Sequence, residues 1–345
     1  ISPSLKDIRE RFWMGSNFLS YKEIKQSIKK IEKQKINLTI FEVLTVIFVL
    51  NAAKKNNDYN LIEAGALFAK DSTNLFDFPK MQAVVNINKQ HLNFLKKKTL
   101  NEVINQKVGF LSNFTNIYIG KQKTLVLKKI KKLLKKNSSL IQYSNSWKLI
   151  KSNNSFFYKD RKIIIKLNTK YIHSKGLLEN LCLAIKIALD LKINKKIIAR
   201  TIPKIKLEAR IDYIMKGRLI KKIFKNEKLL IDGCHSETSA KNLASYLRTL
   251  RVPIYGIWAM TKNKDPDKFI KQFKKIFKKI IAIPIENEPA ALSNQLLFKI
   301  AKKNNYNSET SKNFEEALKK ITSKERKIIC CFGSLYSAGN ILNKN

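Results

Sequence analysis

The feature that most constrains the fold is a regular alternation of short apolar segments with longer amphipathic ones in the second half of the chain. The apolar segments have the length of buried strands and fall at 228–232, 253–258, 280–283 and 327–332. The segments between them have helical periodicity and fall at 238–250, 267–277, 293–303 and 313–321. Such alternation is typical of units in which a helix joins two parallel strands. We therefore predict an α/β fold with a mainly parallel sheet.

The first half shows the same alternation with less regularity. Helices are predicted at 38–53, 99–111, 121–137 and 177–191, strands at 59–63, 83–87 and 116–119, and short β segments between 140 and 167. The strand at 59–63 is expected to be buried. Thr99 is placed to cap the second of these helices, because Glu102 follows it by three residues. The pattern resets near residue 205, so we predict two domains, 1–205 and 206–345.

The charge of the chain raises one alternative function. Lys and Arg number 69 against 26 Asp and Glu, which gives a formal net charge of +43 and suggests a nucleic-acid-binding protein. Lysine supplies nearly all of this charge, whereas groove reading and bidentate phosphate contacts favour the planar guanidinium of Arg. We interpret the lysines as a solvated surface and the basic helix at 121–137 as packed on a sheet, with no membrane and no specific nucleic acid as partner. Nucleic-acid binding stays the alternative.

Cysteine spacing and hydropathy favour a soluble, cytoplasmic protein. The four cysteines show no C-x-x-C spacing; they are Cys182, Cys234, Cys330 and Cys331. This pattern favours reduced thiols over a metal cluster or a disulfide framework. No apolar run reaches the roughly 18 residues that span a bilayer, and the first residues do not have the pattern of a signal peptide.

A glycine-rich phosphate loop of the G-x-x-x-x-G-K-[ST] type is not found in the 345 residues. The nearest segment is Gly120-Lys121-Gln122, which has Thr115 in place of the first glycine and Gln122 in place of the hydroxyl residue. Backbone amides that cradle phosphate are therefore not expected there.

Polar residues that follow predicted strands are candidate site residues, because open α/β sheets bind ligands at the carboxyl ends of their strands. Glu63 closes one predicted strand and His91 follows the next. A carboxylate and an imidazole from neighbouring strand ends can bind a divalent cation. A histidine with a structural or surface role is the alternative for His91.

Short segments spread along the whole chain form an ordered set of motifs. In the first half they are Ser2-Pro3-Ser4-Leu5, Arg9-Glu10-Arg11-Phe12, Thr39-Ile40-Phe41-Glu42, Glu63-Ala64-Gly65 through Asp71-Ser72-Thr73-Asn74, His91, Thr99-Leu100-Asn101-Glu102 and Lys107-Val108-Gly109. In the second half they are Ala209-Arg210-Ile211, Asp232-Gly233-Cys234-His235 and Phe332-Gly333-Ser334-Leu335-Tyr336. This set resembles the folylpolyglutamate synthase / dihydrofolate synthase family, which is related to the Mur ligases.

The resemblance implies an ATP-dependent ligase that joins L-glutamate to a folate or dihydropteroate carboxylate. It implies an ATPase-like first domain and a smaller Rossmann-like second domain, Mg²⁺ as cofactor, and a monomer. Glu63, His91 and Lys107 would bind the metal, with Lys107 carbamylated; Lys107 and His91 would be catalytic. The ATP-binding residues would be Asn180, Arg210, Asp232 and His235, and the substrate-binding residues would be Thr39, Phe41 and Asp71.

The chain also departs from the family pattern. The segment 66–70 lacks two glycines and an arginine that the family carries before the aspartate, so this loop is expected to differ in shape. A catalytically dead paralogue is therefore a further alternative. The resemblance also implies that the phosphate loop lay before Ile1, and we expect the 345 residues alone to be inactive in ATP turnover.

Overall fold

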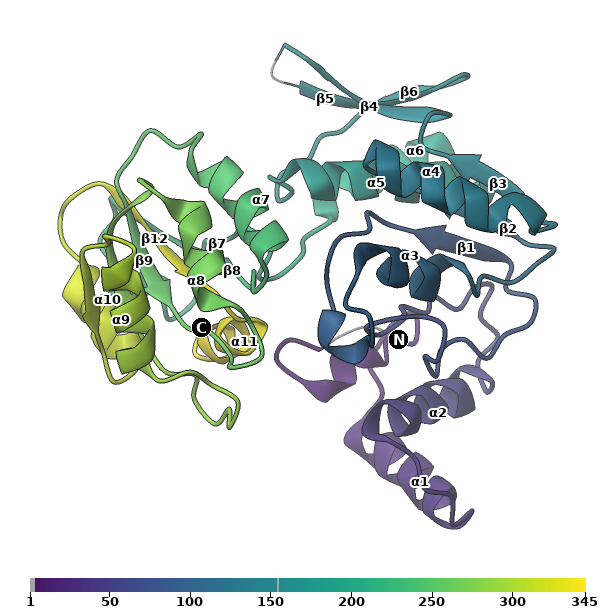
Figure 1. The fold of residues 1–345 in the computed structure, drawn as a ribbon, viewed down its shortest axis with the longest axis horizontal. Coiled ribbons are helices and arrows are strands. Elements are labelled where there is room, and N and C mark those ends of the chain that lie inside the picture. Colours follow the sequence, from purple (N-terminus) through teal and green to yellow (C-terminus); the bar gives the residue numbers. More distant parts are fainter. Residues whose placement is uncertain (1–3, 154) are drawn as a thin grey trace. The chain divides into compact units, whose positions relative to one another are not determined.

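A computed structural model of the chain describes residues 4–153 and 155–345 (Figure 1). Ser2 and Pro3, which belong to the first of the predicted motifs, lie outside the described residues. The chain forms two compact units, one up to Ser144 and the other from Asn145 onward. The predicted boundary at 205/206 falls inside the second unit and stays a prediction.

The first unit contains a three-stranded parallel sheet. Its strands are β1 (Met81–Val84), β2 (Asn116–Ile119) and β3 (Leu140–Tyr143), in the order β1-β2-β3. The helices α3 (Leu100–Val108) and α4 (Thr124–Leu133) connect these strands, and short 3-10 turns lie at η2 (Leu92–Phe94) and η3 (Leu134–Lys136). Both helices bury their apolar faces in one core with the strands. The basic helix therefore packs on the sheet, as predicted, and exposes its lysines.

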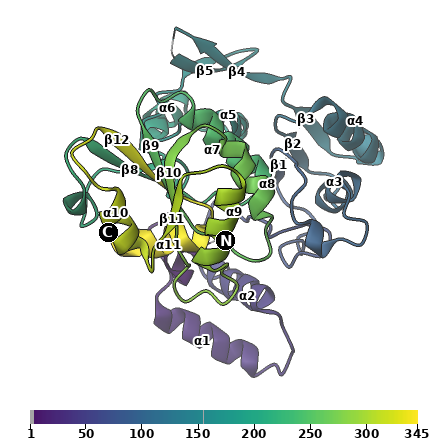
Figure 2. The same cartoon turned by 60° about the vertical axis from the view of Figure 1, so that its left-hand side comes forward.

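A pair of helices forms a second, smaller core in this unit. They are α1 (Tyr21–Glu32) and α2 (Ile40–Ala52), which lie side by side (Figures 1 and 2) and are preceded by the 3-10 turn η1 (Ile8–Arg11). Phe12, Ile47 and Phe48 are among the side chains buried between them. The sequence analysis predicted α2 but not α1, whose high lysine content hides its short apolar stripe.

The prediction of a strand at 59–63 in the first unit is wrong. Residues 59–63 belong to none of the three sheets of the described residues, and the side chain of Leu61 is 84% exposed. A buried strand needs a neighbouring strand and a core beneath it. The segment has the composition of a strand but packs on no such neighbour, so it runs as an irregular connection. The strand predicted at 83–87 forms two residues earlier, as β1.

The second unit begins with a small antiparallel sheet. Its strands are β4 (Trp147–Ser152), β5 (Ser155–Asp160) and β6 (Ile164–Lys166). The helices α5 (Lys175–Asp190) and α6 (Lys195–Thr201) follow, with a 3-10 turn at η4 (Ile202–Lys204). Tyr158 on β5 is fully buried and donates a 2.7 Å hydrogen bond to Asp160.

The larger part of the second unit is a six-stranded sheet in the order β11-β10-β9-β12-β8-β7 (Figures 1 and 2). Its strands are β7 (Asp212–Ile214), β8 (Glu227–Asp232), β9 (Ile254–Trp258), β10 (Phe277–Ala282), β11 (Ser308–Thr310) and β12 (Lys327–Phe332). All neighbours are parallel except β7, which runs antiparallel to β8. The helices are α7 (Glu237–Leu247), α8 (Pro266–Ile270), α9 (Asn294–Lys303), α10 (Phe314–Ile321) and α11 (Leu335–Asn343), with turns η5 (Ile220–Lys222) and η6 (Lys271–Phe273).

Stacked aromatic rings fill the core beside this sheet. Trp258, Phe269 and Phe332 are buried, with ring centroids 5.9 to 6.4 Å apart and nearly parallel planes. All four cysteines are buried free thiols. The strand and helix alternation of the sequence thus produces the predicted mainly parallel α/β architecture. Over residues 4–153 and 155–345, no helix is both long enough and apolar enough to cross a bilayer.

Candidate functional site

A loop between α2 and β1 holds the substrate-binding aspartate of the sequence prediction. Asp71 accepts the backbone N–H of Gly65 through Oδ2 at 2.9 Å and that of Thr73 through Oδ1 at 3.0 Å. The Thr73 hydroxyl donates to Oδ1 as well. A carboxylate that accepts several donors of its own loop fixes the loop conformation. The segment 65–73 is therefore organised around Asp71.

The same loop is packed against α2 through two contacts. A Cβ atom built on Gly65 would lie 2.8 Å from Oδ2 of Asp71 and 3.2 Å from Cε1 of Phe41, so a side chain at this position would crowd both residues. Ser72 is hydrogen-bonded to Thr45 of α2, with 2.6 Å between the two hydroxyl oxygens. Phe41 and Asp71, two of the predicted substrate residues, are thus brought to one place by Gly65.

Three contacts join this loop to α3. Lys107 donates from Nζ to the carbonyl of Ala66 at 2.9 Å, and the backbone N–H groups of Phe68 and Ala69 donate to the carbonyl of Gln106 at 3.2 and 2.9 Å. None of the residues 66–70 has a positive φ. The loop therefore does not need the glycines that it lacks, and it has a conformation that Leu and Phe adopt without strain.

Burial lowers the pKa of Lys107, and attraction to the Asp71 carboxylate acts in the opposite direction. A lysine with a lowered pKa has a larger fraction of neutral amine, the form that attacks CO₂. The environment of Lys107 therefore fits a carbamate-forming lysine.

The predicted metal ligands Glu63 and His91 also belong to the first unit. Glu63 lies on the exposed connection before the Asp71 loop. His91 has the left-handed backbone conformation, with φ 59°, and its ring centroid is 6.3 Å from that of Phe94. Within the described part of the chain, no three His, Cys, Asp or Glu side chains are placed to hold a metal by themselves. The set of Glu63, His91 and Lys107 has only two residues of these types, so it stays a prediction.

Thr39 has a structural role at the start of α2. Its hydroxyl accepts the N–H of Glu42 and donates to the Glu42 carboxylate at 2.7 Å, and Glu42 in turn accepts the N–H of Thr39. This reciprocal arrangement caps the helix. The hydroxyl of Thr39 therefore already donates one hydrogen bond and accepts another within the cap. Its contact with substrate stays a prediction.

Gln122 has a role that the sequence analysis missed. Its side chain accepts the N–H of Ile87 at 3.0 Å and donates to the carbonyl of Val85 at 2.9 Å, and it is 7% exposed. It therefore extends the pairing of β1 and β2 beyond the strand ends. The available sequence signal was a polar side chain two residues after the glycine that follows a predicted strand.

In the second unit, three neighbouring strands end at the same level of the sheet. Asp232 at the end of β8 pairs in register with Phe332 of β12, and Phe332 pairs with Trp258 of β9. Because these strands are parallel, the loops that follow them leave from one edge. These loops begin at Gly233, Ala259 and Gly333, and parallel α/β sheets bind ligands at this edge.

Asp232 fastens an irregular segment that carries Arg210. Its Oδ2 accepts the N–H of Ile211 at 2.8 Å, and its Oδ1 accepts the N–H of Cys234 at 2.8 Å. Burial raises the pKa of Asp232, whereas these two bonds and the charge of Arg210 oppose the rise. A carboxylate has lone pairs beyond those used here, so the predicted ribose contact stays open.

Arg210 is held between two residues with strained backbones. Ala209 has φ 55° and Ile211 has φ 53°, and both are buried. A positive φ is costly for a β-branched residue, about 1–3 kcal/mol. The Asp232 bond to Ile211 and a 2.9 Å bond from Gly233 N–H to the Ala209 carbonyl maintain this conformation. Strain of this kind is found at functional sites, and here it presents the guanidinium of Arg210 beside Gly233.

His235 lies in the loop after β8. Its Nδ1 is 2.9 Å from the carbonyl of Gly233, so the neutral ring donates from Nδ1 and leaves Nε2 as an acceptor. Burial lowers the pKa of His235; the Gly233 carbonyl opposes this, and the charges of Lys264 and Arg210 add to it. The structure therefore groups three of the four predicted ATP-binding residues: Arg210, Asp232 and His235.

Gly333 allows the loop after β12 to pass close to the loop after β9. It has φ 108°, and a Cβ atom there would lie 2.2 Å from the carbonyl oxygen of Ala259. Only glycine fits both the conformation and the space. The fourth predicted ATP-binding residue, Asn180, is exposed on α5, and its role stays a prediction.

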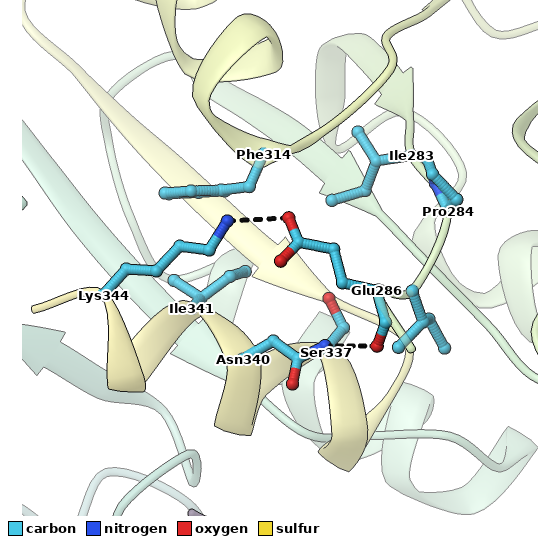
Figure 3. A pocket seen from close by; sticks show the side chains of 9 residues that line it. Ile283, Pro284, Glu286, Phe314, Ser337, Asn340, Ile341 and Lys344 are labelled. Carbon is cyan, nitrogen blue, oxygen red and sulfur yellow. Dashed lines mark hydrogen bonds and ion pairs between the residues drawn. The ribbon is translucent and has the colours of Figure 1, made fainter. Parts of the chain in front are cut away.

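A small hollow elsewhere in this unit contains none of the predicted site residues. It lies between α11 and the segment after β10 (Figure 3). Lys344 crosses it to form a 2.7 Å ion pair with Glu286, and Asn340 donates to the Glu286 carbonyl at 2.9 Å. These contacts hold α11 to the sheet.

Comparisons with known proteins agree with this architecture. Residues 217–344 match the sequence model of the C-terminal domain of dihydrofolate synthetase. The dihydrofolate synthase/folylpolyglutamate synthase of Buchnera aphidicola subsp. Schizaphis graminum is 22% identical over 355 residues, which cover 99% of this chain and 80% of that protein.

Solved structures show the same fold. Folylpolyglutamate synthase from Thermotoga maritima has a TM-score of 0.81 at 21% identity, and E. coli FolC in complex with DHPP and ADP has a TM-score of 0.85 at 17% identity. The bifunctional enzyme of Yersinia pestis complexed with AMPPNP and Mn ion has a TM-score of 0.84 at 17% identity. Each of these matches covers 99% of this chain and 80% of the other.

The chain, with its two α/β units, therefore shares the fold of these solved synthases. In sequence, the chain is similar to folylpolyglutamate synthases / dihydrofolate synthases over 99% of its length, and residues 217–344 match the C-terminal domain of dihydrofolate synthetase.

Proposed function

We propose that this protein is an ATP-dependent ligase that joins L-glutamate to the carboxylate of a folate or of dihydropteroate. The observation that carries the proposal is the strained segment that presents Arg210, fastened by Asp232 at the edge where β8, β12 and β9 end. Backbone strain and a buried carboxylate both reduce the stability of the fold. A nucleotide-binding role for this edge would explain why both are present.

The chemistry follows from the low reactivity of a carboxylate. Its oxygen attacks the γ-phosphorus of ATP, ADP leaves, and an acyl phosphate forms. The amine of glutamate then attacks the acyl carbon, the amide bond forms, and inorganic phosphate departs with the electrons of the C–O bond, while the amine gives up a proton. Positioning and charge stabilisation supply most of the acceleration in phosphoryl transfer.

The residues of the second unit would hold the nucleotide. The Arg210 guanidinium suits phosphate oxygens because its fork of donors matches them. Asp232 would contact the ribose, in addition to the two backbone bonds that it already accepts. His235, kept neutral by burial, would offer Nε2 as an acceptor, and Asn180 would add a further polar contact.

The residues of the first unit would hold the folate side and a metal ion. Phe41 and Asp71, together with Thr39, would contact the pterin-bearing substrate. The donor set of Glu63, His91 and a carbamylated Lys107 fits Mg²⁺ or a similar ion, since the lowered pKa of Lys107 favours the amine that attacks CO₂. When bound, such an ion would neutralise charge on the transferring phosphoryl group.

An assay of product formation tests the proposal. The chain, together with any residues encoded before Ile1, is incubated with ATP, Mg²⁺, glutamate and either dihydropteroate or a reduced folate, and products are identified by mass spectrometry. We expect glutamylated product, and a loss of about 10- to 150-fold in kcat/KM for Arg210→Ala, because a phosphate contact to a charged group contributes about 1.5–3 kcal/mol. Arg251→Ala is the matched control, since Arg251 is exposed in the connection before β9.

Two results would contradict the ligase. A folded protein that forms no product with either substrate would point to the dead paralogue. Binding of one DNA or RNA sequence at least 1,000-fold more tightly than of unrelated sequences, at fixed salt, would point to the nucleic-acid-binding alternative.

A further inference from the structure

The loop after β9 carries a lysine that the predicted site does not include. Lys264 is only partly exposed, and burial lowers the pKa of its ammonium group. Its neighbours have acidic partners: Lys268 pairs with Asp265 at 2.9 Å, and Lys271 pairs with Asp267. Over the described residues, by contrast, no side chain or carbonyl accepts a hydrogen bond from the Lys264 ammonium. A half-buried cation without a partner is costly to the fold.

The position of this lysine is fixed by its loop. Thr261 bonds to Asn263, with 2.8 Å between the side-chain oxygens, and Lys262 N–H donates to the carbonyl of Ala290 at 2.7 Å. The N–H of Lys264 donates to the Thr261 carbonyl at 3.3 Å. The loop leaves the sheet at Ala259, beside Gly333 and at the level where β8 ends.

Lys264 therefore lies at the same sheet edge as Arg210 and His235. Its charge, like that of Arg210, is close enough to disfavour protonation of His235. The acidic groups nearby are already engaged, because Asp232 accepts two backbone N–H groups and Asp265 pairs with Lys268. Lys264, Arg210 and His235 thus lie at one sheet edge, where the two carboxylates named here are engaged by other partners.

We propose that Lys264 and Arg210 form a phosphate-binding site, in which Lys264 supplies the ammonium that contacts a phosphate oxygen of the nucleotide. His235 belongs to this site as a donor, because a bound anion favours its imidazolium form, in which Nε2 carries a proton. The inference rests on the proposed nucleotide role of Arg210 and His235, and it adds a residue from a third loop to their site. Lysine is suited to this contact as a compact point charge. A bound phosphate would supply the negative charge that Lys264 does not receive from an acidic side chain of the described residues.

Binding measurements with three probes test this assignment. The affinities of ADP, adenosine and inorganic pyrophosphate are measured by calorimetry for the wild-type chain, Lys264→Met, Lys264→Arg and Lys262→Met. Lys262 is the matched control, because it lies in the same loop but is exposed. We expect Lys264→Met to weaken ADP and pyrophosphate by about tenfold or more and to leave adenosine unchanged. Lys264→Arg should recover part of the loss, and Lys262→Met should behave as wild type.

An NMR titration adds a readout that loss of folding would not imitate. The chain has three histidines, so the His235 signal can be assigned with a His235→Asn variant. Pyrophosphate should raise the pKa of His235, because an anion favours the imidazolium form. Lys264→Met alone should also raise it, because a nearby positive charge is removed, whereas Lys262→Met should not.

The outcomes separate this inference from the ligase proposal. If Lys264→Met binds ADP and pyrophosphate as tightly as wild type does, the role of Lys264 is refuted and the ligase proposal stands. If the wild-type chain binds pyrophosphate through Lys264 but does not bind ADP, the anion site stands and the nucleotide role is refuted. If it binds neither probe, both are refuted.

Discussion

The ion pair between Lys327 and Glu227 offers a sharp test of how the six-stranded sheet is stabilised. These residues open β12 and β8, are register partners, and have side chains that are 2% and 0% exposed. Their charged atoms are 3.5 Å apart, which corresponds to an attraction of ~5 kcal/mol at an effective dielectric constant of 20. Desolvation offsets most of this attraction while both partners are present.

Removing only the Lys327 cation should therefore destabilise the fold far more than removing both members of the pair. Lys327→Met leaves the buried Glu227 carboxylate with the backbone donors of Phe224 and Ser323 but without a counter-charge. We expect a loss of about 3–5 kcal/mol in the free energy of unfolding, whereas Glu227→Leu combined with Lys327→Met should stay within about 2 kcal/mol of wild type. The surface pair of Lys278 and Glu325, at 3.1 Å, provides the control, and Lys278→Met should cost about 0–1 kcal/mol.

Urea unfolding followed by tryptophan fluorescence measures these differences. Trp13 belongs to the first unit, whereas Trp147 and the buried Trp258 belong to the second, so a Trp13→Phe background reports on the second unit. The midpoint should fall for Lys327→Met with an unchanged m-value. A Lys327→Met variant as stable as Lys278→Met would refute the view that the buried pair, rather than the packing around it, holds these strand ends.

Three further predictions concern the sites. Gly333→Ala should destabilise the second unit by about 2 kcal/mol or more in urea unfolding, because φ is 108° and the new Cβ would meet the Ala259 carbonyl; an equally stable variant would contradict this. The pKa of His235 is lower in the folded protein than its ordinary value of 6.5, so the unfolded chain takes up this proton more readily. The free energy of unfolding should therefore decrease as the pH falls below about 6.5. His235→Gln should therefore unfold with a shallower pH dependence than wild type between pH 6.5 and 5, and equal slopes would refute the shift. Gln122→Ala should lose its bond to Ile87, speed hydrogen exchange of that amide and cost about 1–3 kcal/mol, and unchanged exchange would refute its role.

Local patterns in the sequence were sufficient for most elements of the fold. Periodicity and composition are properties of neighbouring residues, so segments such as 116–119 and 327–332 could be predicted as strands, and both form at those residues. The cap at Thr99 also depends only on residues within one helical turn. The motif around Asp232 could be identified because its spacing is local.

Other features were decided by partners distant in the chain. Residues 59–63 have strand-like composition but no neighbouring strand in the described structure, and burial depends on such a neighbour rather than on composition. The positive φ angles on both sides of Arg210 exist because Asp232, more than twenty residues later, holds them. Lys264 is related to Arg210 and His235 only through the register that aligns the ends of β8, β12 and β9. Sequence determined which residue types follow each strand, and the sheet decided which of them meet, because strand order and register are set by packing over the whole unit.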